Sequence, residues 1–190
     1  CARRFRCRAR SASAPRSFFA ELAALAAKHD FLVCSDEAYS ELWFDEPPAS
    51  ALELTDRSQV VVFNTLSKRS SMTGYRSGFV AGPPWVIDAL RKYRPTVGTA
   101  PQEFVQRASI VAWSDEGHVE RARAVYRRKR DVLVPAFESI GCGAAGKDAT
   151  MYLWFALPDG ESSAAAAERL LGHGILVAPG AYLGEAGEGY

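Results

Sequence analysis

The sequence predicts an α/β fold built on a mixed, mostly parallel sheet, followed by part of a smaller α/β domain. Two short runs, at residues 31–34 and 60–63, are wholly apolar, as in strands that are covered on both faces. These runs alternate with segments in which apolar residues recur at helical spacing. Such alternation favours a parallel sheet, and ligands bind these sheets beyond the carboxyl ends of the strands.

The first part of the chain is expected to form most of a large domain. The expected elements are, in order, a helix at 15–30, strands at 31–34, 60–63 and 77–82, and helices at 83–94 and 101–113. The first helix is expected because apolar residues recur at helical spacing, at Phe18, Leu22, Leu25 and Ala26. Ser13 or Ser17 could be its cap. The strand at 77–82 is the weakest of the three, because it is rich in glycine.

The second part of the chain is expected to form a smaller α/β unit. The expected elements are a long, strongly charged helix at 117–140, a glycine-rich turn at 141–146, a strand at 151–155, a helix at 162–171 and a strand at 175–178. Pro135 is expected to kink or break the long helix. We place a partial large domain at residues 15–115 and a partial small domain, with its connecting helix, at residues 116–190.

Composition excludes several classes of protein. Apolar residues make up 48% of the 190 residues and charged residues 24%, which argues against disorder. No run of 18 apolar residues is present, so we expect no membrane span. The net charge of +1 gives no reason to expect a nucleic-acid partner.

The cysteine and histidine residues carry no metal or disulfide signature. The four cysteines are far apart and include no C-x-x-C pair, which favours a reducing cytoplasm. Cys34 is expected to be a small residue of the core. The three histidines are scattered without the spacing of metal ligands.

The charge is unevenly distributed along the chain. Residues 1–16 contain six arginines and no acidic residue. A basic arm of this kind could bind nucleic acid or act as a transit peptide. We favour a disordered arm over residues 1–14 that takes no part in the fold.

Polar side chains with distinct chemistry follow two of the expected strands. S-D-E-A-Y at 35–39 follows the first, and N-T-L-S-K at 64–68 follows the second, with an arginine at position 76. Taken singly, Asp36 is most simply a helix cap and Lys68 a solvated loop residue. Because both strands are expected to end at the same edge of the sheet, the residues are more informative as a set.

That set matches the chemical needs of pyridoxal phosphate. Its aldehyde needs a lysine amine, and its pyridine nitrogen needs a carboxylate that keeps it protonated. Its phenolic oxygen needs a donor, and its phosphate needs hydroxyl groups and an arginine. The residues that would fill these roles are, in the same order, Lys68, Asp36, Tyr39, and then Thr65, Ser67 and Arg76.

The motifs D-x-x-Y at 36–39, T-L-S-K at 65–68 and R-S-G at 76–78 resemble the class I/II aminotransferases. These are pyridoxal phosphate enzymes with the aspartate aminotransferase fold (fold type I), and the resemblance covers residues 15–190. It implies that Lys68 binds the cofactor as a Schiff base and moves the substrate proton. It also implies an antiparallel third strand, amino acid and 2-oxo acid substrates, and a homodimer.

One subfamily is particularly similar. The segments L-S-K-R-S-S-M-T-G-Y-R-S-G-F at 66–79 and G-I-L-V-A-P-G at 174–180 resemble N-succinyldiaminopimelate aminotransferases of lysine biosynthesis. The implied reaction is amino transfer between N-succinyl-LL-2,6-diaminopimelate and 2-oxoglutarate. Aspartate, alanine and LL-diaminopimelate aminotransferases share much of the pattern, and a β-eliminating lyase could use the same site. Arg69, Tyr75 and Arg94 are conceivable contacts for additional carboxylates, although a solvated or structural role is favoured for each.

The resemblance also predicts segments that this sequence does not contain. The family's phosphate-binding glycine turn, its ring-stacking aromatic residue and its N-P-x-N-P-T-G segment would precede Pro15. The arginine that binds the substrate carboxylate would follow residue 190. We therefore expect a portion of a longer enzyme, with a catalytically incompetent fragment as the alternative. An incomplete sheet is also expected to leave the apolar run at 60–63 uncovered.

Overall fold

A computed structural model describes residues 14–98, 100–146, 149–158 and 160–190. The described residues fall into two compact units, one within Ser13–Ala124 and the other within Val125–Tyr190. The predicted basic arm at 1–14 lies outside the described residues, except for Ala14. No helix in the part that the structure describes is both long and apolar enough to cross a membrane.

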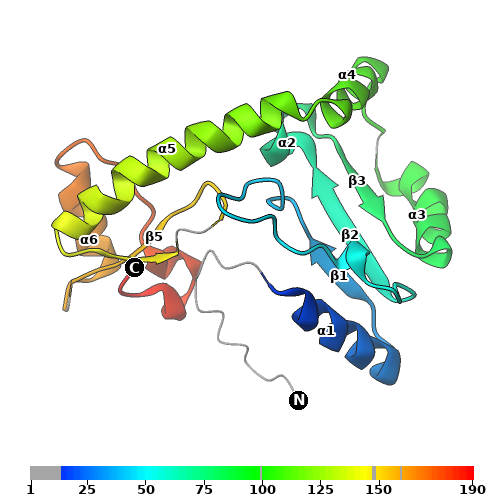
Figure 1. Ribbon diagram of the computed structural model, residues 1–190, viewed down its shortest axis with the longest axis horizontal. Coiled ribbons are helices and arrows are strands. Elements are labelled where there is room, and N and C mark those ends of the chain that lie inside the picture. Colours follow the sequence, from blue (N-terminus) through cyan, green and yellow to red (C-terminus); the bar gives the residue numbers. More distant parts are fainter. Residues whose placement is uncertain (1–13, 99, 147–148, 159) are drawn as a thin grey trace. The chain divides into compact units, whose positions relative to one another are not determined.

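A three-stranded sheet forms the centre of the unit within Ser13–Ala124. Its strands are β1 (Val33–Asp36), β2 (Val60–Thr65) and β3 (Gly78–Ala81), in the spatial order β1-β2-β3 (Figure 1). β1 and β2 are parallel, whereas β2 and β3 are antiparallel. This mixed arrangement confirms the predicted α/β fold, with the third strand antiparallel.

The three predicted helices of this unit are present in the predicted order, and the short helix α2 is additional. The helices are α1 (Arg16–His29), α2 (Leu66–Arg69), α3 (Pro84–Val97) and α4 (Glu103–Ser114), with 3-10 turns η1 (Ala51–Glu53) and η2 (Thr73–Tyr75). Pro15 occupies the N-cap of α1 without a side-chain cap, so Ser17 lies inside the helix and does not cap it. The helix ends where Asp30 adopts a left-handed backbone conformation, with φ of 50°.

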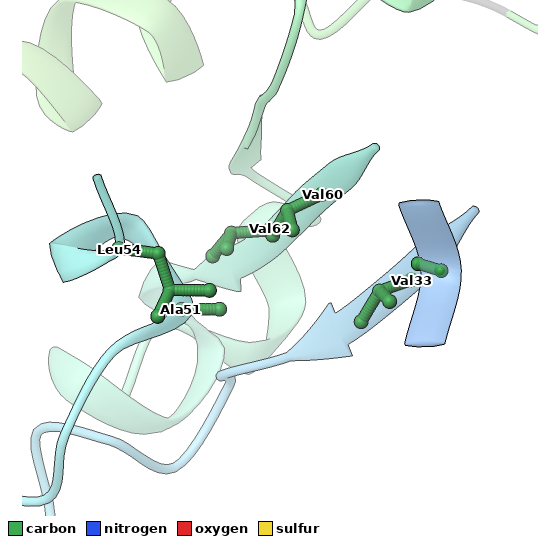
Figure 2. Close-up of a cluster of buried hydrophobic side chains, with 6 residues drawn as sticks. Val33, Ala51, Leu54, Val60 and Val62 are labelled. Carbon is green, nitrogen blue, oxygen red and sulfur yellow. The ribbon is translucent and has the colours of Figure 1, made fainter. Parts of the chain in front are cut away.

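The core of this unit lies between α1, η1 and the sheet. Ala26 of α1 packs in one cluster with Ala51 of η1, with Leu54 just after η1, and with three valines of β1 and β2. The valines are Val33, Val60 and Val62, and Figure 2 shows the cluster. Val60, Val61 and Val62 are each 1% exposed. The expectation that the run at 60–63 would be uncovered is therefore wrong for the valines. α1 and η1 cover Val60 and Val62, and Val61, on the opposite face of β2, is buried as well.

The strand β1 is covered less completely than its apolar sequence predicted. Val33 and Ser35 are buried, whereas Cys34 and Asp36 are exposed. Successive side chains of a strand point to opposite faces, so only one face of β1 is covered by the described residues. The prediction of a core role for Cys34 is accordingly wrong.

The unit within Val125–Tyr190 contains most of α5 (Gly117–Ser139), which continues through Pro135 without interruption. Its other elements are β4 (Gly143–Gly146), β5 (Trp154–Ala156), α6 (Ser163–Leu171), η3 (Gly180–Leu183) and η4 (Glu185–Gly187). β4 and β5 pair antiparallel, and the Phe137 and Phe155 rings stack with centroids 4.3 Å apart.

Three local predictions in this unit differ from the structure. The expected glycine-rich turn contains β4, and the strand expected at 151–155 is confined to Trp154–Ala156. Residues 175–178 form no strand, and Leu176 is 85% exposed. An apolar run becomes a strand only beside a hydrogen-bonding partner, and the described residues supply none there.

Candidate functional site

The sheet topology brings the predicted site residues to one edge. β1 and β2 are parallel, so Asp36 and Thr65 both stand at carboxyl ends on the same edge of the sheet. β3 is antiparallel and begins there, with Gly78 opposite Thr65. Arg76 is two residues before Gly78 and therefore lies near the edge of the sheet where β1 and β2 end.

The segment that follows β1 is fastened to the carboxyl end of β2 by hydrogen bonds. The Glu37 amide donates to the Phe63 carbonyl oxygen at 2.9 Å. The Asn64 side-chain amide donates to the Ser40 hydroxyl at 3.3 Å, and its oxygen accepts from the Thr65 amide at 2.7 Å. The two stretches that carry the predicted site are thus held as one structure.

Lys68 lies on the short helix α2, directly after β2. Thr65 caps this helix, because its hydroxyl oxygen accepts from the Ser67 amide at 3.1 Å. The turn places the half-buried Lys68 with its Nζ 5.5 Å from the centre of the Tyr39 ring. The predicted lysine and phenol are therefore neighbours, although Tyr39 follows the other strand.

The predicted phosphate hydroxyls also lie together. Thr65 Oγ1 is 3.0 Å from Ser67 Oγ and donates to the Ser77 carbonyl oxygen at 2.8 Å. Ser67 is only 7% exposed. Thr65 consequently has a structural function of its own: it caps α2 and joins β2 to the residue that precedes β3.

Asp36 and Arg76 are exposed at the same edge. One carboxylate oxygen of Asp36 accepts from the Ala38 amide at 3.1 Å, which orients the side chain at the strand end. Arg76 has a left-handed backbone, with φ of 51°, and donates from Nη1 to the Thr73 carbonyl oxygen at 3.2 Å. Within the described residues, neither side chain contacts another of the predicted site residues directly.

Sequence reasoning overlooked Glu37, which lies in the centre of the motif at 35–39. Its carboxylate is buried and accepts from the hydroxyls of Ser35 and Ser50, at 3.1 and 2.7 Å, and from the Ala51 amide at 2.9 Å. It thus anchors the segment between Asp36 and Tyr39 on η1. Strand alternation carried the signal, since Glu37 follows Asp36 and faces the covered side.

Arg69 is a buried structural residue. It is 1% exposed, donates to the Ala112 carbonyl oxygen at 2.7 Å and pairs with Glu116. The structural role, which the sequence favoured over contact with a substrate carboxylate, is therefore confirmed. Tyr75 and Arg94, together with Arg76, instead line an open hollow of about 1400 Å³ beside β3, α3 and α4.

A histidine joins the end of α2 to the start of α5. His118 makes hydrogen bonds from Nε2 to the Ser70 hydroxyl at 2.8 Å and from Nδ1 to Asp115 Oδ2 at 2.9 Å. The bond from His118, followed by a bond from the Gly117 amide, lowers the pKa of Asp115 below its ordinary value. The sequence did not indicate this link between His118 and the Lys68 turn.

Comparisons with known proteins agree with this geometry. The family model "Aminotransferase class I and II" matches residues 11–189. An LL-diaminopimelate aminotransferase of Maridesulfovibrio salexigens is 37% identical over 185 residues, which are 95% of this chain and 48% of that protein. The chain thus spans about half the length of the curated relatives that it matches.

Solved structures give the same fold. The aromatic aminotransferase of Pyrococcus horikoshii matches with a TM-score of 0.85 and 31% identity, covering 95% of this chain and 50% of that one. A probable N-succinyldiaminopimelate aminotransferase of Thermus thermophilus matches with a TM-score of 0.86 and 28% identity, covering 94% and 49%. The match along nearly the whole sequence and the shared fold establish that this chain belongs to the class I and II aminotransferase family.

Proposed function

We propose that the native protein containing this chain is a pyridoxal phosphate-dependent aminotransferase that exchanges amino groups between an amino acid and a 2-oxo acid. The observation that carries the proposal is the position of Lys68, whose amine lies 5.5 Å from the Tyr39 ring at the edge where β1 and β2 end. Membership of the family supports it. The proposal includes a homodimer, which the sequence resemblance implies, and a cytoplasmic location, which the cysteine pattern favours.

The donor set at this edge fits the cofactor. Among the residues that the structure describes, no hydrogen bond or ion pair occupies the Lys68 amine, so it is available to an aldehyde. Asp36 offers an exposed carboxylate for a protonated pyridine nitrogen, and Arg76 offers an exposed guanidinium for phosphate oxygens. The Ser67 hydroxyl adds a donor for the phosphate, whereas the adjacent Thr65 hydroxyl would have to leave the Ser77 carbonyl oxygen to donate there as well.

Each side chain then has a defined task. Pyridoxal phosphate, when bound, supplies an electron sink for the bond that breaks at the substrate Cα. The Lys68 amine would hold the cofactor and, when freed by an amino acid, would accept the proton that leaves the substrate Cα. Asp36 would keep a proton on the pyridine nitrogen, and the Tyr39 hydroxyl would donate to the phenolic oxygen.

For the amino donor we infer a molecule built on the diaminopimelate skeleton. The motifs at 66–79 and 174–180 resemble the subfamily that uses the N-succinyl form, and one structural neighbour carries that name. Several relatives at 35–39% identity are named for the free LL form. The names share a long donor with two carboxylates, which requires cationic groups beyond the cofactor site.

Borohydride reduction of the native protein with pyridoxal phosphate tests the cofactor site. The expected adduct maps to Lys68 and is absent from Lys68→Ala. Lys68→Arg should not restore it, because a guanidinium stays protonated and is a poor nucleophile at neutral pH. Lys92→Ala, on an exposed face of α3, is the matched control and should leave the adduct unchanged. An adduct on another lysine would refute the assigned site.

Competition between amino donors, with 2-oxoglutarate as acceptor, tests the substrate class. Free or N-succinylated LL-diaminopimelate should exceed aspartate and alanine by about tenfold or more in kcat/KM, which is about 1.4 kcal/mol of discrimination. The two diaminopimelate forms are assayed separately, which decides between the subfamilies. Preference for aspartate or alanine would contradict the donor, and release of ammonia and pyruvate would indicate a lyase instead.

A further inference from the structure

We propose that Arg69 is a positioning residue for Lys68: it fastens the turn of α2 that carries the lysine to the junction between α4 and α5. The inference rests on the proposed function, since it concerns the placement of the cofactor-binding amine. Lys68 and Arg69 are adjacent in sequence, and both lie within α2 (Leu66–Arg69). Whatever holds Arg69 therefore restricts Lys68.

The contacts of Arg69 span a large distance in sequence. Its Nη1 donates to the Ala112 carbonyl oxygen, 43 residues away, at 2.7 Å, and its Nη2 pairs with Glu116. The guanidinium carbon lies 5.0 Å from the centre of the Trp113 ring. These partners are at the end of α4 and just before α5. The planar guanidinium is therefore bonded along its edge, to Ala112 and Glu116, and covered on one face by the Trp113 ring.

A weaker contact extends from Arg69 toward the Tyr39 segment. Arg69 Nε lies 3.8 Å from Glu41 Oε1 and has no hydrogen-bond partner within the described residues, although it is buried. Glu41 also lies 3.8 Å from Arg123, which stacks on the Trp43 ring at 4.4 Å. Arg69 thereby links the α4–α5 junction to Glu41, two residues after Tyr39. Tyr39 is the residue whose ring lies beside the Lys68 amine.

The next residue is fastened to the same junction. The Ser70 hydroxyl bonds to His118, which in turn bonds to Asp115. Two consecutive residues after Lys68 are therefore tied to residues 112–118, Arg69 by its buried guanidinium and Ser70 by its neutral hydroxyl. This double attachment holds the short helix, which on its own is too short to be stable.

A geometric role for Arg69 does not require a large net gain in stability. The guanidinium is buried and has lost its hydration, whereas Glu116 stays exposed, so water screens the attraction between the two charges. The directional bonds of the guanidinium nevertheless require one arrangement of its partners. Catalysis is sensitive to that arrangement, since a displacement of about 1 Å in a reacting group can slow a reaction by roughly a hundredfold.

Hydrogen exchange tests the attachment independently of the cofactor. The amides of Ser70 and Met72 both donate to the Leu66 carbonyl oxygen and report on α2. In the native protein, Arg69→Met should speed their exchange by about tenfold or more, and Glu116→Gln should give a smaller increase. Arg107→Met is the matched control, because Arg107 is an exposed arginine of α4 whose ion pair is with Glu103. It should leave both amides unchanged.

The rate at which borohydride-trapped pyridoxal phosphate accumulates on Lys68 tests the positioning itself. It should fall by about tenfold or more in Arg69→Met, fall less in Glu116→Gln, recover partly in Arg69→Lys and stay constant in Arg107→Met.

If Arg69→Met does not fold, the milder variant Glu116→Gln decides the outcome. Normal trapping in Glu116→Gln with accelerated exchange, or unchanged exchange in both variants, overturns the proposal. If the unaltered protein forms no borohydride adduct on Lys68, the proposed function is contradicted. The exchange rates of the Ser70 and Met72 amides then still test whether Arg69 holds α2 to the α4–α5 junction.

Discussion

Lys68 Nζ lies 5.5 Å from the centre of the Tyr39 ring, although the two residues follow different strands of the sheet. The parallel pairing of β1 with β2 creates this proximity, because it places both strand ends at one edge. The ring presents its electron-rich face to the ammonium, while the phenol oxygen lies at the ring's outer end. Tyr39 can thus orient the lysine with its ring and donate to a cofactor with its hydroxyl.

The two functions of Tyr39 are separable by mutation. Tyr39→Phe keeps the ring beside Lys68 and removes only the hydroxyl, so the native protein should bind pyridoxal phosphate about tenfold more weakly, as expected for one hydrogen bond. Tyr39→Leu should weaken it further. The measurement is the dissociation constant from cofactor absorbance, with the exposed Tyr93→Phe as a control that should not change it. Equal affinities of the unaltered and Phe proteins would contradict a donor role.

Arg76 is expected to recognise the phosphate and not the ring. Arg76→Lys keeps the charge but loses the planar fork that matches phosphate oxygens. Affinity for pyridoxal phosphate should fall by roughly 10- to 100-fold, which corresponds to the loss of a charged hydrogen bond. Affinity for pyridoxal, which lacks the phosphate, should stay constant and serves as the internal control. An equal decrease for both compounds would show that Arg76 acts elsewhere.

Gly78 is required where β3 meets β2. A Cβ at this position would lie 2.4 Å from the Asn64 carbonyl oxygen, far inside van der Waals contact. Gly78→Ala should therefore lower the free energy of unfolding by about 1–3 kcal/mol, measured by urea denaturation. Gly74→Ala is the matched control, because its Cβ would meet no atom within 4 Å. Equal free energies of unfolding for the two variants would contradict the prediction, because β2 and β3 would then make room for the added Cβ without loss of stability.

Glu188 should make the unit within Val125–Tyr190 sensitive to acid. The Ser163 amide, and then the Ser163 hydroxyl, hold the pKa of Glu188 below its ordinary value at the start of α6. Because the folded pKa is lowered, the stabilisation is full above the pKa of the unfolded group, about 4.3. It is lost as the pH falls through the folded value.

Thermal denaturation followed by circular dichroism checks this pH dependence. Glu188→Gln should unfold at a lower temperature than the unaltered protein near pH 7, and the gap should close as the pH falls below about 4. Glu185→Gln, in the exposed turn η4, should show no gap that depends on pH in this way. A gap that persists in acid would contradict the role of the Glu188 charge.

Features carried by local sequence were predictable. The spacing of Phe18, Leu22 and Leu25 predicted α1, and the apolar run at 60–63 predicted β2, because both signals arise from residues close together in the chain. The chemistry of the site was also apparent, since a lysine, a carboxylate and a phenol after two strands suggest one cofactor. The assignment of each residue to a part of that cofactor stays a prediction.

Other features depended on partners that the local pattern does not reveal. Arg69 follows Lys68 in a polar loop sequence, yet it is buried, because Ala112 and Glu116 approach it only after the chain has folded. Residues 175–178 have the composition of a strand but form none, because a strand needs a neighbour with which to share hydrogen bonds. The sequence by itself determined which chemical groups are available and where helices and strands are favoured. Only the tertiary structure decided which groups meet and which are buried, because contacts between distant segments arise from packing and not from local pattern.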